Sequence, residues 1–174
     1  MKTLTCFAAI LLLSLTAPGQ SQKDSSADKT KPKTTPTPAS SSSASAARTV
    51  VEAKDAPKPI GPYSQAIKAG EFVFCAGQTA RDPITNKLIE GDVSAQTDRV
   101  LKNISAVLTA AGTDFDHVVK TTVYLKNMSD FNAMNEVYGR FFKDAPPARA
   151  TVGVAALPVD ALIEIEVVAM LPGK

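Results

Sequence analysis

The sequence predicts an α+β domain in which a mixed β-sheet carries two helices on one face. Apolar residues recur at helical spacing in two separate segments, and the last long segment alternates apolar and polar residues as a strand does. Two amphipathic helices must each bury one side, and a sheet with one apolar face provides the surface for both. We therefore expect a two-layer sandwich with the order strand, strand, helix, strand, helix, strand, strand.

The first two strands are predicted from short runs of β-forming residues. Residues 49–53 form one such run, which ends at the proline-rich stretch 57–62. Residues 71–76 form the second, which stops at Gly77. Residues 82–87 (DPITNK) have the composition of a turn.

The first helix has a clear start and a clear end. Asp92 can accept a hydrogen bond from the first turn, and Gly112 can adopt the left-handed conformation that closes a helix. Between them an apolar stripe recurs at helical spacing: Val93, Thr97, Val100, Leu101, Ile104, Leu108 and Ala111.

A third strand and a second helix follow. Residues 117–126 are rich in β-branched residues and predict the strand. The helix is expected to begin near Ser129 and to end before Pro146 and Pro147. Its apolar stripe consists of Phe131, Met134, Val137, Tyr138 and Phe141.

The last strand, residues 162–170, sorts its side chains onto two faces. Ile163, Ile165, Val167 and Ala169 should pack beneath the helices. Glu164, Glu166 and Val168 fall on the other face, which is half apolar and half acidic. Such a face favours self-association, and we expect Glu164 to lie near a subunit boundary.

The N-terminal residues have the composition of targeting and linker segments. Residues 1–19 combine Lys2, an apolar run over residues 7–15 and small residues before a cleavage point after Gly19, which predicts a signal peptide and export to the periplasm or the medium. Residues 20–47 hold no aromatic residue and no aliphatic one larger than Ala, which predicts a disordered linker. The globular domain should span residues 48–174, with no membrane contact after signal removal.

Charge and cysteine counts exclude several classes of function. Residues 1–47 hold five Lys and two Asp (net +3), whereas residues 48–174 hold 14 basic and 15 acidic residues (net −1). A nucleic-acid-binding domain usually has a basic face, so we expect no nucleic-acid partner. Cys75 is the one cysteine after the signal and His117 the one histidine, which leaves too few ligands for a zinc cluster.

Several motifs resemble those of the RidA/YjgF family. They are Ile60-Gly61-Pro62-Tyr63-Ser64-Gln65, Gly77-Gln78, Lys120-Thr121-Thr122-Val123, Pro147-Ala148-Arg149 and Ile163-Glu164-Ile165-Glu166. The match runs collinearly from about residue 50 to the end of the chain.

The resemblance implies a chorismate-mutase-like fold, a homotrimer with three active sites at the subunit clefts, and cofactor-free deamination of reactive 2-imino or 2-enamino acids to 2-keto acids and ammonia. By position, Arg149 matches the residue that binds the substrate carboxylate and Glu164 the catalytic carboxylate. Tyr63, Gly77, Asn135 and Thr151 match substrate-binding positions.

Two positions depart from the family pattern. Ala76 stands where the family often has a serine, and Thr151 stands where many members have a cysteine. The first change removes a possible hydrogen bond to the nitrogen side of the substrate. Both changes concern the choice of substrate more than the class of reaction.

The chemistry of these residue types agrees with the implied reaction. The guanidinium of Arg149 can donate two parallel hydrogen bonds to a carboxylate. Glu164 can activate a water against the C=N carbon and then protonate the departing ammonia, which requires no metal. Cys75 is a poor nucleophile candidate because its neighbours are apolar, and a buried cysteine is usually a small hydrophobic residue.

Two other functions remain open from the sequence. The domain could be a module that binds a small carboxylate without turnover, because Ala76 removes a polar group from the expected site. It could also degrade RNA or inhibit translation, although its near-neutral charge argues against clustered phosphate contacts.

Overall fold

A computed structural model describes residues 48–173; the predicted signal peptide and linker (residues 1–47) lie outside the described residues. The strands are β1 (Thr49–Val51), β2 (Ala66–Ala69), β3 (Phe72–Thr79), β4 (Val118–Leu125), β5 (Ala148–Gly153) and β6 (Ile163–Met170), and the helices are α1 (Val93–Ala111) and α2 (Phe131–Phe141). Short 3-10 turns, Phe115–His117, Met128–Asp130 and Pro158–Asp160, join them.

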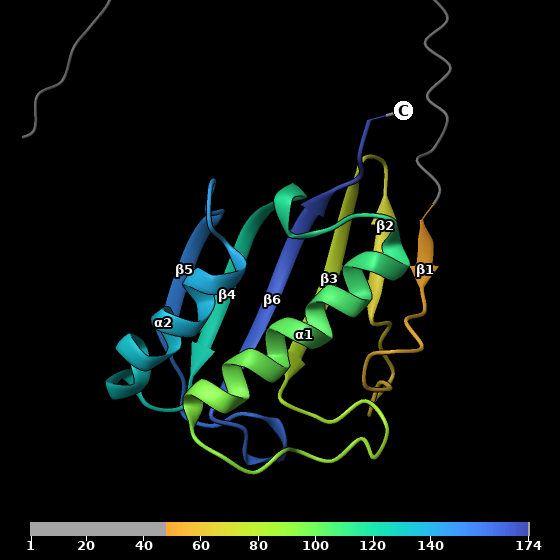
Figure 1. The fold of residues 1–174 in the computed structure, drawn as a ribbon. Coiled ribbons are helices and arrows are strands. Elements are labelled where there is room, and N and C mark those ends of the chain that lie inside the picture. Colours follow the sequence, from red (N-terminus) through yellow and green to blue (C-terminus); the bar gives the residue numbers. More distant parts are fainter. Residues whose placement is uncertain (1–47, 174) are drawn as a thin grey trace, which may run out of the picture. The chain divides into compact units, whose positions relative to one another are not determined.

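The strands form a six-stranded mixed sheet in the order β1-β2-β3-β6-β4-β5. The β4–β5 pair is parallel and all other neighbours are antiparallel. Both helices lie on the same face of the sheet, α1 across the β3–β6 side and α2 over β4 and β5 (Figure 1). This arrangement confirms the predicted two-layer α+β fold.

Helix α1 begins and ends where the sequence predicts. The Asp92 carboxylate accepts a hydrogen bond from the Ala95 amide at 2.9 Å, and Gly112 closes the helix with φ 82°. All seven residues of the predicted apolar stripe are buried. Helix α2 starts two residues later than predicted, because Met128–Asp130 form a 3-10 turn before the regular helix.

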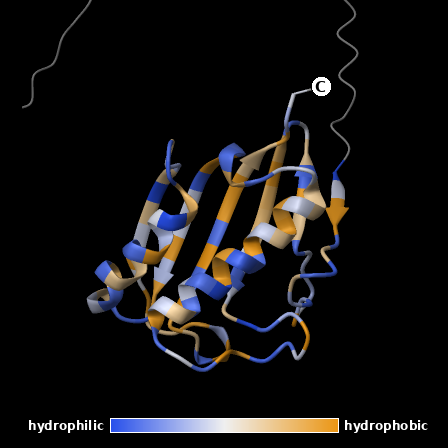
Figure 2. Cartoon of the chain, viewed as in Figure 1, coloured by the Kyte–Doolittle hydropathy of each residue, from blue (hydrophilic) through white to orange (hydrophobic). Residues whose placement is uncertain are grey.

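The alternation predicted for the last strand is also confirmed. Ile163, Ile165, Val167 and Ala169 are at most 1% exposed beneath the helices. β3 and β6 form the centre of the sheet, and Figure 2 shows hydrophobic and hydrophilic bands along β6. On the opposite face, Phe74 and Val152 are 48% and 42% exposed, and no helix of residues 48–173 covers them. None of the described helices is long and apolar enough to cross a bilayer.

One strand is absent from the prediction. Residues Ala66–Ala69 form β2, which pairs with β3 across the turn at Gly70 and with β1 on its other side. Its sequence, AIKA, has little β propensity of its own. The pairing of β2 therefore depends on its neighbours.

Candidate active site

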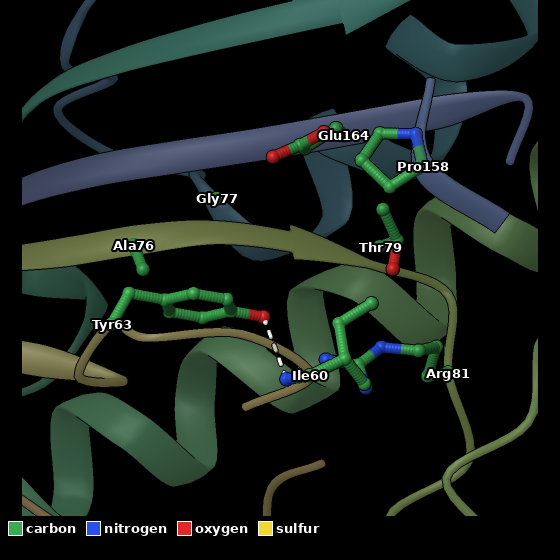
Figure 3. A pocket seen from close by; sticks show the side chains of 8 residues that line it. All are labelled: Ile60, Tyr63, Ala76, Gly77, Thr79, Arg81, Pro158 and Glu164. Atoms are coloured by element: carbon green, nitrogen blue, oxygen red, sulfur yellow. Dashed lines mark hydrogen bonds between the residues drawn. The ribbon is translucent and has the colours of Figure 1, made fainter. Parts of the chain in front are cut away.

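Glu164 lies on the helix-free face of the sheet, beside an irregularity in the adjacent strand. It pairs with Thr79 on β3 and with Tyr124 on β4. The β3–β6 register shifts between Cys75 and Gln78, which is the geometry of a β-bulge. A Cβ atom at position 77 would lie 2.0 Å from Glu164 Oε1, so glycine at this position leaves the space that the carboxylate occupies (Figure 3).

The environment of Glu164 favours its protonated form. Burial raises the pKa of its half-buried carboxyl, and the nearby charge of Glu166 raises it further. Glu166 accepts a hydrogen bond from the Tyr124 hydroxyl at 3.2 Å. The ion pairs among residues 48–173 do not include Glu164. A carboxyl of this kind can exchange protons closer to neutral pH than an exposed one.

Tyr63 faces the same space from the loop between β1 and β2. Its hydroxyl accepts a hydrogen bond from the Ile60 amide at 3.3 Å, and the side chain is 43% exposed. The loop is held by Gln65, which is buried and hydrogen-bonds the backbone of Ala53 and the carbonyl of Pro57. The tyrosine therefore stands on an anchored segment.

These residues enclose a cleft of about 280 Å³, and Figure 3 shows Tyr63 and Glu164 on opposite sides of it. Its wall includes Tyr63, Ala76, Gly77, Arg81, Pro158 and Glu164. The sequence predictions missed Arg81 and Pro158. Arg81 had no pattern to mark it, since it is a single charge next to a turn, and Pro158 opens the short turn before β6.

Arg149 lies in a different place, on the edge strand β5. Its guanidinium carbon is 4.6 Å from the centroid of the Tyr138 ring and 5.8 Å from that of Phe131, both on α2. These are cation–π distances, so the two rings orient the guanidinium. With Asn135, Tyr138, Phe142 and Pro147, Arg149 lines an open recess between α2 and the start of β5.

Within one chain, Arg149 and Glu164 belong to opposite faces of the sheet. Arg149 is opposite Thr121, whose hydroxyl bonds that of Tyr138 at 2.8 Å beneath α2. Glu164 is opposite Tyr124, three residues further along β4 and therefore on the other face. The residues predicted to bind the substrate carboxylate and to act as the catalytic carboxylate thus lie in two separate places of the chain.

The remaining predicted residues divide in the same way. Gly77 and Tyr63 join the Glu164 cleft, and Asn135 joins the Arg149 recess. Thr151 lies two residues beyond Arg149 on β5 and lines neither space. Its buried hydroxyl oxygen has no hydrogen-bond partner among the described residues.

Cys75 and His117 have other surroundings. Burial raises the pKa of the Cys75 thiol to about 12, so the thiol is un-ionised at neutral pH and unsuited to nucleophilic attack. His117 is paired with Asp114 at the surface, far along the chain from the cleft residues. Within residues 48–173, no three His, Cys, Asp or Glu side chains cluster in a way that could hold a metal ion.

Comparison with known proteins finds close relatives of the folded domain. Residues 53–171 match the family model described as Endoribonuclease L-PSP. The chain is 55% identical over 122 residues to a RutC family protein of Pyrococcus horikoshii, covering 70% of this chain and 97% of the relative. It is 46% identical over 123 residues to the 2-iminobutanoate/2-iminopropanoate deaminase of Homo sapiens, covering 71% and 90% of the two chains.

A solved structure shows the same fold. The crystal structure of E. coli TdcF with bound serine superposes with a TM-score of 0.67 at 38% identity, over 70% of this chain and 98% of TdcF. The resemblance to RidA/YjgF proteins inferred from the sequence motifs is confirmed. The chain belongs to the Endoribonuclease L-PSP family, the group that includes the RutC and RidA proteins.

Proposed function

We propose that the protein hydrolyses reactive 2-imino or 2-enamino acids to 2-keto acids and ammonia, at sites shared between copies of the chain in a homotrimer. The observation that carries this proposal is the cleft around Glu164, in which a half-buried carboxyl of raised pKa faces Tyr63 over the bulge at Gly77. The human relative is named for this reaction, and TdcF was solved with an amino acid bound.

The proposal that two copies of the chain share one site rests on the separation of Arg149 from Glu164 within a single chain. Arg149 is the residue suited to a substrate carboxylate, yet it lies on the helix side of the sheet at an edge strand. Glu164 lies on the helix-free face, where Phe74 and Val152 expose apolar surface. A second copy of the chain that packs against this face buries the apolar surface and can bring its own Arg149 to the cleft. When three copies each make this contact with the next, the ring closes as a trimer.

The proposed reaction uses side chains alone. Arg149 of a second copy binds the carboxylate of the substrate through two parallel hydrogen bonds. The substrate enters as the protonated imine, and the Glu164 carboxylate accepts a proton from a water molecule as the water oxygen bonds to the C=N carbon, which gives an amino alcohol. Glu164 then gives this proton to the amine nitrogen. The C–N bond breaks as the hydroxyl group of the intermediate returns its proton to the Glu164 carboxylate, which leaves the keto acid and ammonia.

Mixing two inactive variants tests the shared site. We expect Arg149→Ala and Glu164→Gln each to abolish release of keto acid from imino acids formed in situ by an amino-acid oxidase. In trimers co-refolded from equal amounts of both, about a quarter of the interfaces pair an intact Arg149 with an intact Glu164, so about a quarter of the activity should return. A site confined to one chain predicts no recovery.

The same assay distinguishes the alternative functions. A folded wild-type protein that binds 2-keto acids but accelerates no imine hydrolysis would instead be a carboxylate-binding module, for which Ala76 in the cleft wall is the supporting observation. Cleavage of single-stranded RNA by residues 48–174 that survives Glu164→Gln would favour the nuclease activity in the family description.

We also propose that the protein is exported, on the basis of Lys2 and the apolar run over residues 7–15. The mass of the protein recovered from the periplasm or the medium of a secreting host tests this. Cleavage after Gly19 supports export through a signal peptide, and uncleaved protein confined to the cytoplasm contradicts it.

A further inference from the structure

Arg81 is an almost fully buried cation in the wall of the Glu164 cleft. Arg81 is 5% exposed and lies two residues after the end of β3 at Thr79. Its backbone is fixed, because Asn103 on α1 donates a hydrogen bond to the Arg81 carbonyl at 2.9 Å. Nη1 donates to the Lys58 carbonyl and to Asn86 Oδ1, both at 3.0 Å. The guanidinium is therefore held in one position.

No carboxylate neutralises this charge among the described residues. The ion pairs in residues 48–173 are Lys102–Asp98, His117–Asp114 and Lys126–Asp160. Burying a cation without a counterion is costly, and such positions are usually paired or serve to bind an anion.

Part of the guanidinium remains available to a ligand. Of its five N–H donors, those on Nε and Nη2 have no hydrogen-bond partner among the described residues. The buried side-chain atoms without a hydrogen-bond partner in residues 48–173 are Gln78 Oε1, Asn103 Oδ1 and Thr151 Oγ1, so Nε and Nη2 of Arg81 are not fully buried. Arg81 lines the cleft, and Figure 3 shows it on the side of Ile60, with Glu164 and Pro158 on the other side.

We propose that Arg81 binds a second anionic group of the substrate, so that the preferred substrates are short dicarboxylic imino or enamino acids. This inference rests on the proposed function: Arg149 of a second copy holds the carboxylate next to the imine, and Arg81 holds the side-chain carboxylate. The assembled cleft then has two cations against the single carboxylate of Glu164. A volume of about 280 Å³ suits a ligand of four or five carbons.

The test compares imines that differ in one charge. Keto-acid release is measured for imines generated in situ from aspartate, asparagine and alanine. We expect the wild-type protein to prefer the aspartate-derived imine to the nearly isosteric asparagine-derived one by about 10-fold in kcat/KM, as for one charged hydrogen-bonded contact. Arg81→Met should remove this preference, because it should raise KM for the aspartate-derived imine about 10-fold more than KM for the asparagine- and alanine-derived imines.

A structural role of Arg81 gives a different result. Arg81 joins Lys58 to the turn at Asn86, so a merely structural residue would lower Tm and reduce turnover of all three imines alike, which would overturn the inference. Asn86→Gly is the matched control, because it removes one Arg81 contact and suits the φ of 60° at this position. The control should keep the preference for the aspartate-derived imine.

Two further outcomes separate this inference from the proposed function. If Arg81→Met does not fold, the wild-type comparison still decides: equal turnover of the aspartate- and asparagine-derived imines overturns the inference alone. If the wild-type protein accelerates hydrolysis of none of the imines, the proposed function fails and the inference fails with it.

Discussion

The cleft around Glu164 and the recess around Arg149 hold their charged groups in different ways. Glu164 is half buried on a central strand, flanked by β3 and β4, and its pKa is raised by burial and by Glu166. Arg149 is on the edge strand β5 and is oriented by the rings of Tyr138 and Phe131 in an open recess. The first environment changes the proton affinity of its residue, whereas the second only orients a permanent charge. We infer that the cleft serves proton transfer and that the recess serves binding.

Replacing the carboxyl in the cleft should have the largest effect. We expect Glu164→Gln to lower kcat by about 10²–10⁴-fold, the usual contribution of a general acid–base group, with KM little changed. Steady-state kinetics and a circular-dichroism melt measure activity and folding. Glu71→Gln, an exposed acid at the β2–β3 turn, is the control and should keep full activity. An unchanged kcat in Glu164→Gln would show that Glu164 does not transfer protons in the reaction.

Adding a methyl group at the β-bulge should lower kcat nearly as much, although it removes no polar group. In Gly77→Ala the new Cβ would overlap Glu164 Oε1, so the carboxyl must move. A displacement of about 1 Å lowers kcat by about 10²-fold. Gly173→Ala adds a methyl group with no neighbour within 4 Å and should leave kcat unchanged. Wild-type kcat in Gly77→Ala would show that the position of the carboxyl is unimportant.

A change in the recess should affect binding instead. Arg149→Lys keeps the charge but loses the two parallel hydrogen bonds and the flat contact with Tyr138. We expect KM to rise about 10-fold, as for the loss of one charged hydrogen bond, with a smaller change in kcat. Arg140→Lys, exposed in the last turn of α2, provides the matched control. A fall in kcat at constant KM would contradict the division of roles.

The smallest effect should be a shift along the pH axis. Glu166→Gln removes a like charge that raises the pKa of Glu164, so the acid limb of kcat/KM should move to lower pH. A limb that stays in place or moves upward would exclude Glu164 as the group titrated.

The raised pKa of Glu164 in the wild-type protein also predicts how the stability of the fold depends on pH. A raised pKa means that the folded protein prefers the protonated form of Glu164. Its contribution to stability is complete below about pH 4.3, the usual Glu pKa, and is lost as the pH rises through the raised value. Relative to Glu164→Gln, the Tm of the wild type should therefore fall over this interval, as thermal melts between pH 4 and 8 can show.

Much of the fold could be predicted because local signals agree with it. Asp92 and Gly112 delimit α1, and the alternation in β6 assigns each of its side chains to a face. Strand β2 had no such signal, since AIKA is a strand only through pairing with β1 and β3.

The sequence named candidate residues for the site but not how the fold arranges them. Arg149 and Glu164 match family motifs, yet their placement on opposite faces depends on the register of β4 with both β5 and β6, which no single segment encodes. Arg81 was not predicted, because its burial in the cleft wall follows from tertiary packing.

Along β6, side chains that pack in the core alternate with the side chain that faces the cleft, so the position of Glu164 depends on the register of this strand. Ile163 and Ile165 are buried in the core, and Glu164 between them faces the cleft. A slip of β6 by one residue would place the acid in the core and the isoleucines in solvent, so a misregistered chain is both unstable and inactive. Under the proposed function, turnover therefore reports on correct folding, and heating should abolish activity at the same temperature at which the sheet melts.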